Sequence, residues 1–340
     1  MPPPTDFETY ELGDLPLAGG VTLPDATLAY KTHGTLNTDG SNAVLFPTWF
    51  SAYHSDNEWA LGEGKALDDY FVIMPNQLGN GLSSSPSNTP APHGGADFPA
   101  LSMRDQVTAQ HRLVTEHFGL ERLALVVGSS MGAGQTWQWA VSHPEMVERA
   151  APIVGSPKTS EHNKVFLASL RAALITDQTF AGGRYDPDKP PVDGLRAFAR
   201  VYAGWGFSQA FYWQQAYRNL GFSTLEEFLT GFWEAFFLDD RDPNNLLTMV
   251  EAWNNADVGQ SPGFDGDTEA ALRSIRCPVL DLPCRTDLYF PPEDEQHWSQ
   301  FVPHGQVQVI PSIYGHFAGL GADPDAVAFI DRALRDLLRN

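Results

Sequence analysis

The chain has 340 residues, of which 42 are acidic and 21 basic, so its formal net charge is −21 at neutral pH. This charge makes nucleic acids and anionic membrane surfaces poor partners. No stretch approaches the run of about 18 apolar residues that a membrane-spanning helix needs. The length fits one large globular domain, or one domain with a sizeable insertion.

Short apolar runs alternate with helix-like segments up to residue 155 and again near the end of the chain. Helical segments are expected from Ser102, over 130–144, from about residue 293 and over 325–338. Alternating strands and helices predict a mostly parallel sheet covered by helices on both faces. The expected strands are NAVLFP (42–47), YFVIMPN (70–76), LALVVG (123–128), APIVG (151–155), CPVLDLP (277–283) and QVQVIP (306–311).

The segment 158–272 breaks this alternation because it is helix-like and contains no convincing strand. We therefore expect a helical lid there, inserted between a first core part at 1–157 and a second at 273–340. Most of its aromatic side chains should pack between helices, and a few are expected to line an apolar tunnel. They are Trp205, Phe207, Phe211, Tyr212, Trp213, Tyr217, Phe232, Trp233, Phe236 and Phe237.

Residues 128–132 read GSSMG and match the pattern G-x-S-x-G with Ser130 in the nucleophile position. In that pattern, glycines on either side of the serine permit a sharp turn from a strand into a helix. The turn places the hydroxyl at the helix N-terminus, where backbone N–H groups stabilise negative charge. The apolar run before Ser130 and the helical segment after it supply this context. Ser129 is expected to serve the turn instead.

A serine nucleophile needs a base, and the base needs an acid that orients it. His316 lies in a loop after the last predicted strand, and Asp287 follows the strand before it. This gives the chain order serine, acid, histidine that the motif requires. Asp281 is the rival acid, but in mid-strand it should lie below the reactive edge of the sheet. The other histidines after Ser130 are His143, His162, His297 and His304.

The negative oxygen that forms during acyl transfer needs two N–H donors. One is expected from Met131, directly after the nucleophile, and the other from the loop after NAVLFP, at Phe50. No metal or other cofactor is expected, because the histidines are scattered without H-E-x-x-H or C-x-x-C spacing.

The two cysteines, Cys277 and Cys284, both lie in CPVLDLPC. A strand there would hold them roughly 20 Å apart, too far for a disulfide. Free thiols suit a cytoplasmic protein, and the opening MPPPTDFETY lacks the basic and apolar regions of a signal peptide. We therefore expect a cytoplasmic location.

The sequence resembles a known family, the homoserine O-acetyltransferase family of α/β-hydrolases. The resemblance covers nearly the whole chain. It implies the α/β-hydrolase fold, a ping-pong mechanism through an acyl-serine, the same triad by position and a homodimer through the lid helices. Its acyltransferase members use an acyl-CoA donor. The segments that carry it are LAYKTHGTLN (28–37), GEGKALD (62–68), YFVIMPNQLG (70–79), FAGGRYDP (180–187), GLRAFAR (194–200), DLYFPPE (287–293) and YGHFAGL (314–320).

Two departures from the family concern the acceptor. Homoserine-acylating members carry an aspartate directly after the histidine and an arginine in the lid. Here these places are Phe317 and the stretch 205–208, which has no arginine. A buried amino acid without charged partners would be costly to desolvate, so homoserine is not an expected acceptor. The expected substrate contacts are Phe207, Phe317, Trp205 and Tyr53.

Three functions remain open. The first is hydrolysis of a small-molecule ester or amide with an apolar portion, with water releasing the acyl group from Ser130. The second is transfer of an acyl group from an acyl-CoA to an acceptor other than homoserine. The third is a non-catalytic binding protein on the same fold, which the complete triad disfavours.

Overall fold

The computed structural model describes residues 3–339, and a single twisted sheet runs through the centre of this part of the chain. Its strands are β1 (Glu8–Pro16), β2 (Thr22–His33), β3 (Ala43–Leu45), β4 (Phe71–Pro75), β5 (Leu125–Ser129), β6 (Ala150–Ile153), β7 (Val279–Asp281) and β8 (Gly305–Val307). Their order is β1-β2-β4-β3-β5-β6-β7-β8. The six strands β3 to β8 pair in parallel, whereas β1 and β2 pair antiparallel. The prediction of a mostly parallel sheet is confirmed.

The hairpin of β1 and β2 at one edge of the sheet is the part that apolar periodicity does not predict. β1 exposes most of its residues, and its register to β2 shifts twice, between Glu11 and Gly13 and between Gly13 and Leu15. An exposed, irregular edge strand lacks the continuous apolar run that marks the buried strands. The segment 28–37, which carries part of the family resemblance, overlaps β2.

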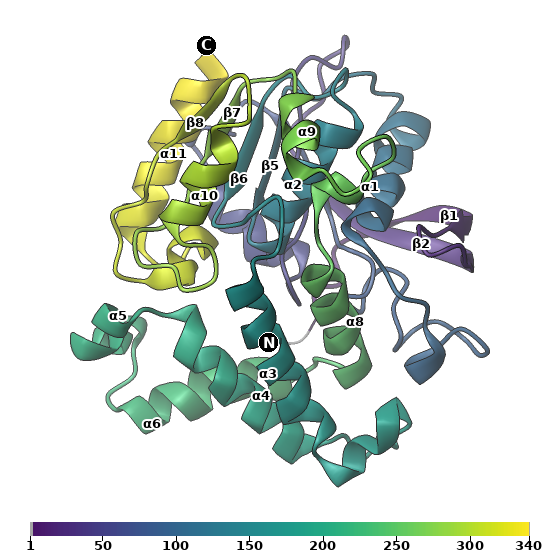
Figure 1. Ribbon diagram of the computed structural model, residues 1–340, viewed down its shortest axis with the longest axis vertical. Helices are drawn as coiled ribbons and strands as arrows, with labels where there is room; N and C mark the ends of the chain where they lie inside the picture. The colour runs from purple at the N-terminus through teal and green to yellow at the C-terminus, as the bar shows by residue number, and fades with distance from the viewer. Residues whose placement is uncertain (1–2, 340) are drawn as a thin grey trace.

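Helices cover the sheet and also form a separate layer. They are α1 (Met103–Arg112), α2 (Met131–Ser142), α3 (Glu161–Ile175), α4 (Val192–Gly206), α5 (Gln209–Trp213), α6 (Leu225–Phe228), α7 (Ala235–Leu238), α8 (Pro243–Asn254), α9 (Thr268–Arg273), α10 (Pro292–Ser299) and α11 (Pro324–Arg339). Figure 1 shows α1, α2, α9, α10 and α11 around the sheet, and α3, α4, α5, α6 and α8 gathered beneath it. Within residues 3–339, no helix has both the length and the apolar character to cross a membrane.

The helices beneath the sheet lie beyond the carboxyl ends of its parallel strands. They follow β6 in the chain. Strands β3, β5, β6 and β7 run parallel, so their carboxyl ends lie at the same edge of the sheet. Ligands of open α/β sheets bind outside the carboxyl ends of the strands. The insertion therefore lies where it can cover such a site, and α9 returns the chain to the side of α2 (Figure 1).

Candidate active site

Ser130 occupies a sharp turn between β5 and α2. Its backbone has φ 55° and ψ −121°, a conformation that L-residues rarely adopt. Two neighbouring glycines make the turn possible: a Cβ on Gly128 would lie 2.3 Å from the carbonyl oxygen of Gly132, and one on Gly155 would lie 2.4 Å from that of Ser130. The backbone strain is held by tight packing on both sides, which leaves Ser130 fixed at the carboxyl edge of the sheet.

The Ser130 hydroxyl meets the other two residues predicted for the triad. Its Oγ lies 2.7 Å from Nε2 of His316, and Nδ1 of His316 lies 2.8 Å from Oδ2 of Asp287. All three residues are at most 4 % exposed. The second carboxylate oxygen, Oδ1 of Asp287, accepts the backbone N–H groups of Tyr289 at 2.8 Å and Phe290 at 3.3 Å. The carboxylate is thereby locked with one oxygen facing the imidazole.

The loop that carries His316 is held by Thr286, one residue before the acid. Oγ1 of Thr286 donates to the carbonyl of Ser312 at 3.0 Å and accepts the N–H of Gly315 at 3.1 Å. Gly315 has φ 61° and packs closely on the backbone of Ser208, which lies between α4 and α5 of the insertion. Acid and base therefore share one anchor in Thr286, and the insertion supports the same loop through Ser208, whose hydroxyl donates to the carbonyl of Ile313.

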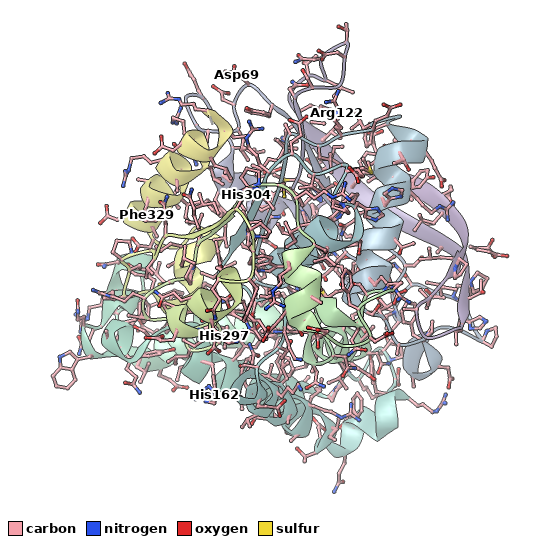
Figure 2. All side chains as sticks on the ribbon, turned by 45° about the horizontal axis from the view of Figure 1, so that its top comes forward. Asp69, Arg122, His162, His297, His304 and Phe329 are labelled. Atoms are coloured by element: carbon pink, nitrogen blue, oxygen red, sulfur yellow. The ribbon has the colours of Figure 1, made fainter. Side chains whose placement is uncertain are left out.

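The alternative histidines do not meet Ser130. Figure 2 shows His162 on α3, His297 on α10 and His304 in the turn before β8, and all three are exposed. His143, at the end of α2, instead stacks on His111 with ring centroids 4.1 Å apart. Burial lowers the pKa of His143 to about 4, so this imidazole is neutral at physiological pH.

The rival acid Asp281 lies inside β7 and is completely buried. Its Oδ2 accepts a hydrogen bond of 3.0 Å from Ser299, and the carboxyl group of Glu295 is its buried neighbour. Burial raises the pKa of Asp281 to about 7. Burial, with the adjacent Asp281 charge, raises the pKa of Glu295 well above its usual range. Asp281 is therefore part of a buried acid pair rather than the partner of the imidazole.

This acid pair makes stability depend on pH in a defined direction. Because the folded-state pKa values lie above those of the unfolded chain, the unfolded chain binds fewer protons from about pH 4 to about pH 7, and stability falls as pH rises through that range. We expect Glu295→Gln to raise the melting temperature by a few degrees at pH 8 and by much less at pH 5. Thermal unfolding at both pH values checks this. Equal shifts at the two pH values would show that the pair does not titrate as described.

The loop after β3, residues 46–52, carries the donor predicted at Phe50 and is fixed by side-chain amides. Asn57 donates to the carbonyls of Phe46 and Pro47, and Gln77 donates to that of Trp49 at 2.6 Å. Such ties hold backbone donors in place before a substrate arrives.

Gln135 connects this loop to the nucleophile turn. Its Nε2 donates to the carbonyl of Thr48 at 3.0 Å and to that of Met131 at 3.2 Å. The two predicted donors, the N–H groups of Phe50 and Met131, therefore belong to segments that one buried side chain holds together. Their role as an oxyanion hole stays a prediction.

Ser130 and His316 open into a cavity of about 290 Å³ with a mainly aromatic lining. The insertion contributes Tyr202, Phe232, Trp233, Phe236 and Phe237, and the rest of the chain contributes Trp49, Phe50, Ser51, Asp56, Phe317, Leu320, Gly321 and Ala322. Apart from His316, no basic side chain lines it. Burial raises the pKa of Asp56, the one carboxylic acid of the lining.

Of the four side chains predicted to contact substrate, Phe317 lines the cavity. Phe207 lies behind it, completely buried, with the two rings stacked 4.4 Å apart. Trp205 packs against Phe166 and His162, outside the lining. Tyr53 also lies outside the lining, because its hydroxyl donates to Asp240 at 2.9 Å and the guanidinium of Arg241 covers its ring.

The sequence did not single out Tyr202, Ser51, Gln77 or Gln135. Lid aromatics as a group were expected, and Phe232, Trp233, Phe236 and Phe237 are the ones that reach the cavity. The available signal for the two amides was their position. Gln77 directly follows a predicted strand and Gln135 comes five positions after the nucleophile, and parallel strands bring their carboxyl ends together.

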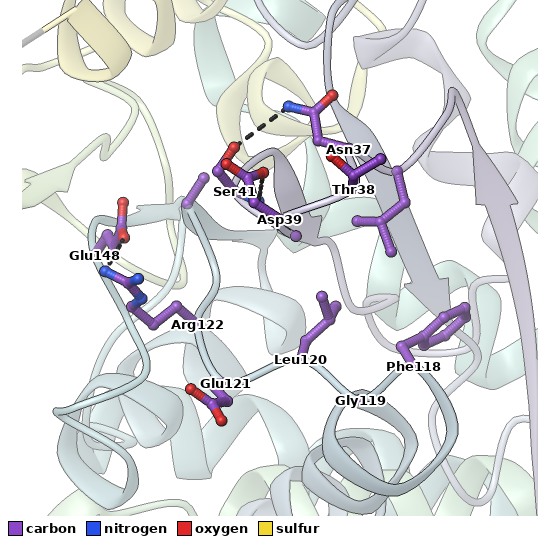
Figure 3. A pocket seen from close by; sticks show the side chains of 13 residues that line it. Asn37, Thr38, Asp39, Ser41, Phe118, Gly119, Leu120, Glu121, Arg122 and Glu148 are labelled. Carbon is purple, nitrogen blue, oxygen red and sulfur yellow. Dashed lines mark hydrogen bonds and ion pairs between the residues drawn. The ribbon is translucent and has the colours of Figure 1, made fainter.

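A second cavity, of about 380 Å³, lies at the opposite end of the strands (Figure 3). Residues 36–41 and 118–122, which precede β3 and β5, supply most of its lining. Arg122 and Glu148 form an ion pair of 3.7 Å at its rim. No triad residue reaches this cavity. Within residues 3–339, no group of three or more His, Cys, Asp or Glu residues could hold a metal ion.

The sheet order, the nucleophile turn and the bonded serine, histidine and aspartate define a class of proteins. The chain belongs to the α/β-hydrolase fold family, whose model matches residues 43–322.

Three relatives describe its place in that family. The chain is 40 % identical to the ethyl acetate hydrolase of Pseudomonas veronii, over 98 % of this chain and 95 % of that one. It is 33 % identical to the homoserine O-acetyltransferase of Trichormus variabilis, over 89 % and 87 % of the two chains. The crystal structure of an acetylester hydrolase from Corynebacterium glutamicum superposes with a TM-score of 0.95 at 38 % identity, covering 98 % and 96 %. The resemblance to homoserine O-acetyltransferases is confirmed, and esterases are more similar still.

Proposed function

We propose that the protein is a serine esterase that hydrolyses small, uncharged esters. Ser130 Oγ attacks the ester carbonyl while His316 Nε2 takes its proton, and His316 then returns the proton to the departing alcohol. Asp287 orients the imidazole and stabilises its charged form. The backbone N–H groups of Phe50 and Met131 stabilise the oxyanion. Water attacks the acyl-Ser130, and His316 again takes and returns the proton.

The observation that carries this proposal is the hydrogen-bonded chain from Ser130 Oγ to His316 to Asp287 at the wall of an apolar cavity. A volume of about 290 Å³ lies at the small end of the range for ligand pockets. The lack of a basic lining residue disfavours a negatively charged acyl group. Similarity to an ethyl acetate hydrolase and an acetylester hydrolase supports a short acyl chain and a small alcohol.

An acyltransferase that uses an acyl-CoA is the second candidate, because homoserine O-acetyltransferases are among the relatives. Phe207 and Phe317 argue against homoserine as its acceptor. These are the places at which that family's charged contacts were expected, and their rings stack on each other instead. Any other acceptor of the transferase reaction would have to be apolar enough to enter the aromatic cavity.

Product analysis separates the two candidates. We expect ethyl acetate and p-nitrophenyl acetate to be hydrolysed with release of acetate, and longer acyl chains to react more slowly. Acetyl-CoA with homoserine should give no O-acetylhomoserine above the Ser130→Ala background. Formation of O-acetylhomoserine faster than ester hydrolysis would overturn the assignment in favour of the transferase.

The role of the helical insertion follows from its cavity residues. We propose that helices α3 to α8 form a lid over Ser130, since five of the lining residues come from it. Trp213 on α5 is 88 % exposed and supports a homodimer through this lid. A monomeric molar mass in solution would contradict the dimer.

Burial raises the pKa of both free cysteine thiols to about 11, and unpaired thiols support a cytoplasmic location.

A further inference from the structure

The cavity lining contains four uncharged polar side chains outside the triad: Trp49, Ser51, Tyr202 and Trp233. The indole N–H groups of Trp49 and Trp233 and the hydroxyl of Ser51 have no hydrogen-bond partner among residues 3–339, and protein atoms enclose them completely. The Tyr202 hydroxyl also has no partner among residues 3–339, but protein atoms do not enclose it completely. It is therefore the uncharged polar group of the lining that is left open to a molecule in the cavity.

Tyr202 is held rigidly between the two halves of the site. Its ring stacks on Phe50 of the loop after β3, with centroids 5.8 Å apart, and meets Tyr289 edge-on at 6.0 Å. Tyr289 in turn packs against the imidazole of His316 at 4.5 Å. Tyr202 thus lies between the predicted oxyanion loop and the base. A side chain clamped on several faces holds its hydroxyl in one place without further loss of entropy.

The hydroxyl of Tyr202 acts as a donor throughout the physiological range. Burial, reinforced by the negative charge of Asp287, raises its pKa well above the ordinary value. The carboxylate of Asp56, the charged group of the lining outside the triad, is engaged elsewhere. It accepts the backbone N–H of Tyr53, and Arg241 is the cation that acts on it.

The hydrolysis proposed above needs a water molecule in this apolar cavity. A water is retained at such a place when it has two to four polar partners. His316 Nε2 supplies one, as the acceptor of the proton that the water loses. We propose that the Tyr202 hydroxyl supplies the next, donating to the oxygen of the water that attacks the acyl-Ser130. This inference rests on the proposed esterase function and concerns its second half.

In that step the oxygen of the water forms a bond to the acyl carbon, and its proton passes to His316 Nε2. The tetrahedral intermediate then collapses, the bond from carbon to Ser130 Oγ breaks, and His316 returns the proton to Oγ. Tyr202 neither gains nor loses a proton. An alcohol in the same place is held by apolar contacts of its alkyl group as well, so it depends less on this hydrogen bond.

The test compares Tyr202→Phe with Tyr217→Phe. Tyr217 is a buried lid tyrosine whose hydroxyl also lacks a partner among residues 3–339, but it does not line the cavity. Neither substitution removes a bond within the protein, so both variants should keep the melting temperature of the wild type. Acid-quenched samples analysed by mass spectrometry follow formation and decay of acetyl-Ser130 from p-nitrophenyl acetate.

For Tyr202→Phe we expect decay of the acetyl-enzyme to slow about tenfold, as loss of one ordinary hydrogen bond implies, while its formation is nearly unchanged. With 1-propanol present, the ratio of propyl acetate to acetate should rise severalfold. Tyr217→Phe should change neither quantity. Unchanged decay, or equal slowing of formation and decay, would overturn the role of Tyr202. If the wild type forms no acetyl-Ser130, the esterase proposal itself fails, which is a separate result.

Discussion

Replacing Ser130 with alanine is expected to lower ester turnover by about 10⁴–10⁶-fold, the range found when a triad residue is deleted. The substitution removes the Oγ that His316 Nε2 contacts at 2.7 Å and leaves no other hydroxyl bonded to that nitrogen. The hydroxyl makes no further bond within residues 3–339, so fold and melting temperature should be retained. Steady-state hydrolysis of p-nitrophenyl acetate, with circular dichroism as a check on folding, measures both.

Ser129→Ala is the matched control. Its hydroxyl is one residue away, completely buried and without a partner in the described part of the chain, but it does not line the cavity. We expect this variant to keep wild-type turnover. Ordinary activity in Ser130→Ala, or equal losses in the two variants, would show that Ser130 is not the nucleophile.

Replacing Asp287 with asparagine is expected to lower turnover by about 10⁴-fold, as loss of this charge does in other serine triads. The reason lies in its contacts. The N–H groups of Tyr289 and Phe290 need an acceptor, so the amide oxygen takes the place of Oδ1. The amide NH₂ then faces His316 Nδ1, and the imidazole proton moves to Nε2. An Nε2 that carries a proton is unable to accept one from Ser130.

The pH profile and a second variant distinguish this effect from general damage. Asp287→Asn should recover part of its activity at high pH, where the serine alkoxide forms more readily. Asp281→Asn should keep wild-type turnover, since Asp281 is buried in β7 and bonded by Ser299. Loss of activity in Asp281→Asn with retention in Asp287→Asn would reverse the assignment of the acid.

The sequence predicted which serine, histidine and aspartate form a hydrogen-bonded chain, because local rules place each of the three. The G-x-S-x-G pattern needs a strand before it and a helix after it, and β5 and α2 supply them. Asp287 and His316 follow β7 and β8, whose carboxyl ends lie at the same edge of a parallel sheet. Each of these three positions depends on one turn beside one strand, so the pattern of the chain was enough.

The cavity lining could not be predicted in the same way. Helix α4 is buried against several neighbours, and periodicity does not tell which buried face looks toward Ser130. Phe207 was chosen from its correspondence to a polar contact in relatives, but the helix ends at Gly206 and the ring stacks behind Phe317. Tyr202, one turn earlier, reaches the cavity. Tertiary packing determines that Tyr202, and not Phe207, faces the cavity.

The central claim is that an acyl group passes through Ser130 to water. The most direct measurement is peptide mass mapping of protein quenched in acid during turnover of p-nitrophenyl acetate. The account predicts one acetyl group on the peptide that contains Ser130, decaying no more slowly than the enzyme turns over and absent from Ser130→Ala. Full turnover with no adduct on Ser130, or with the acetyl group on another residue, would contradict it.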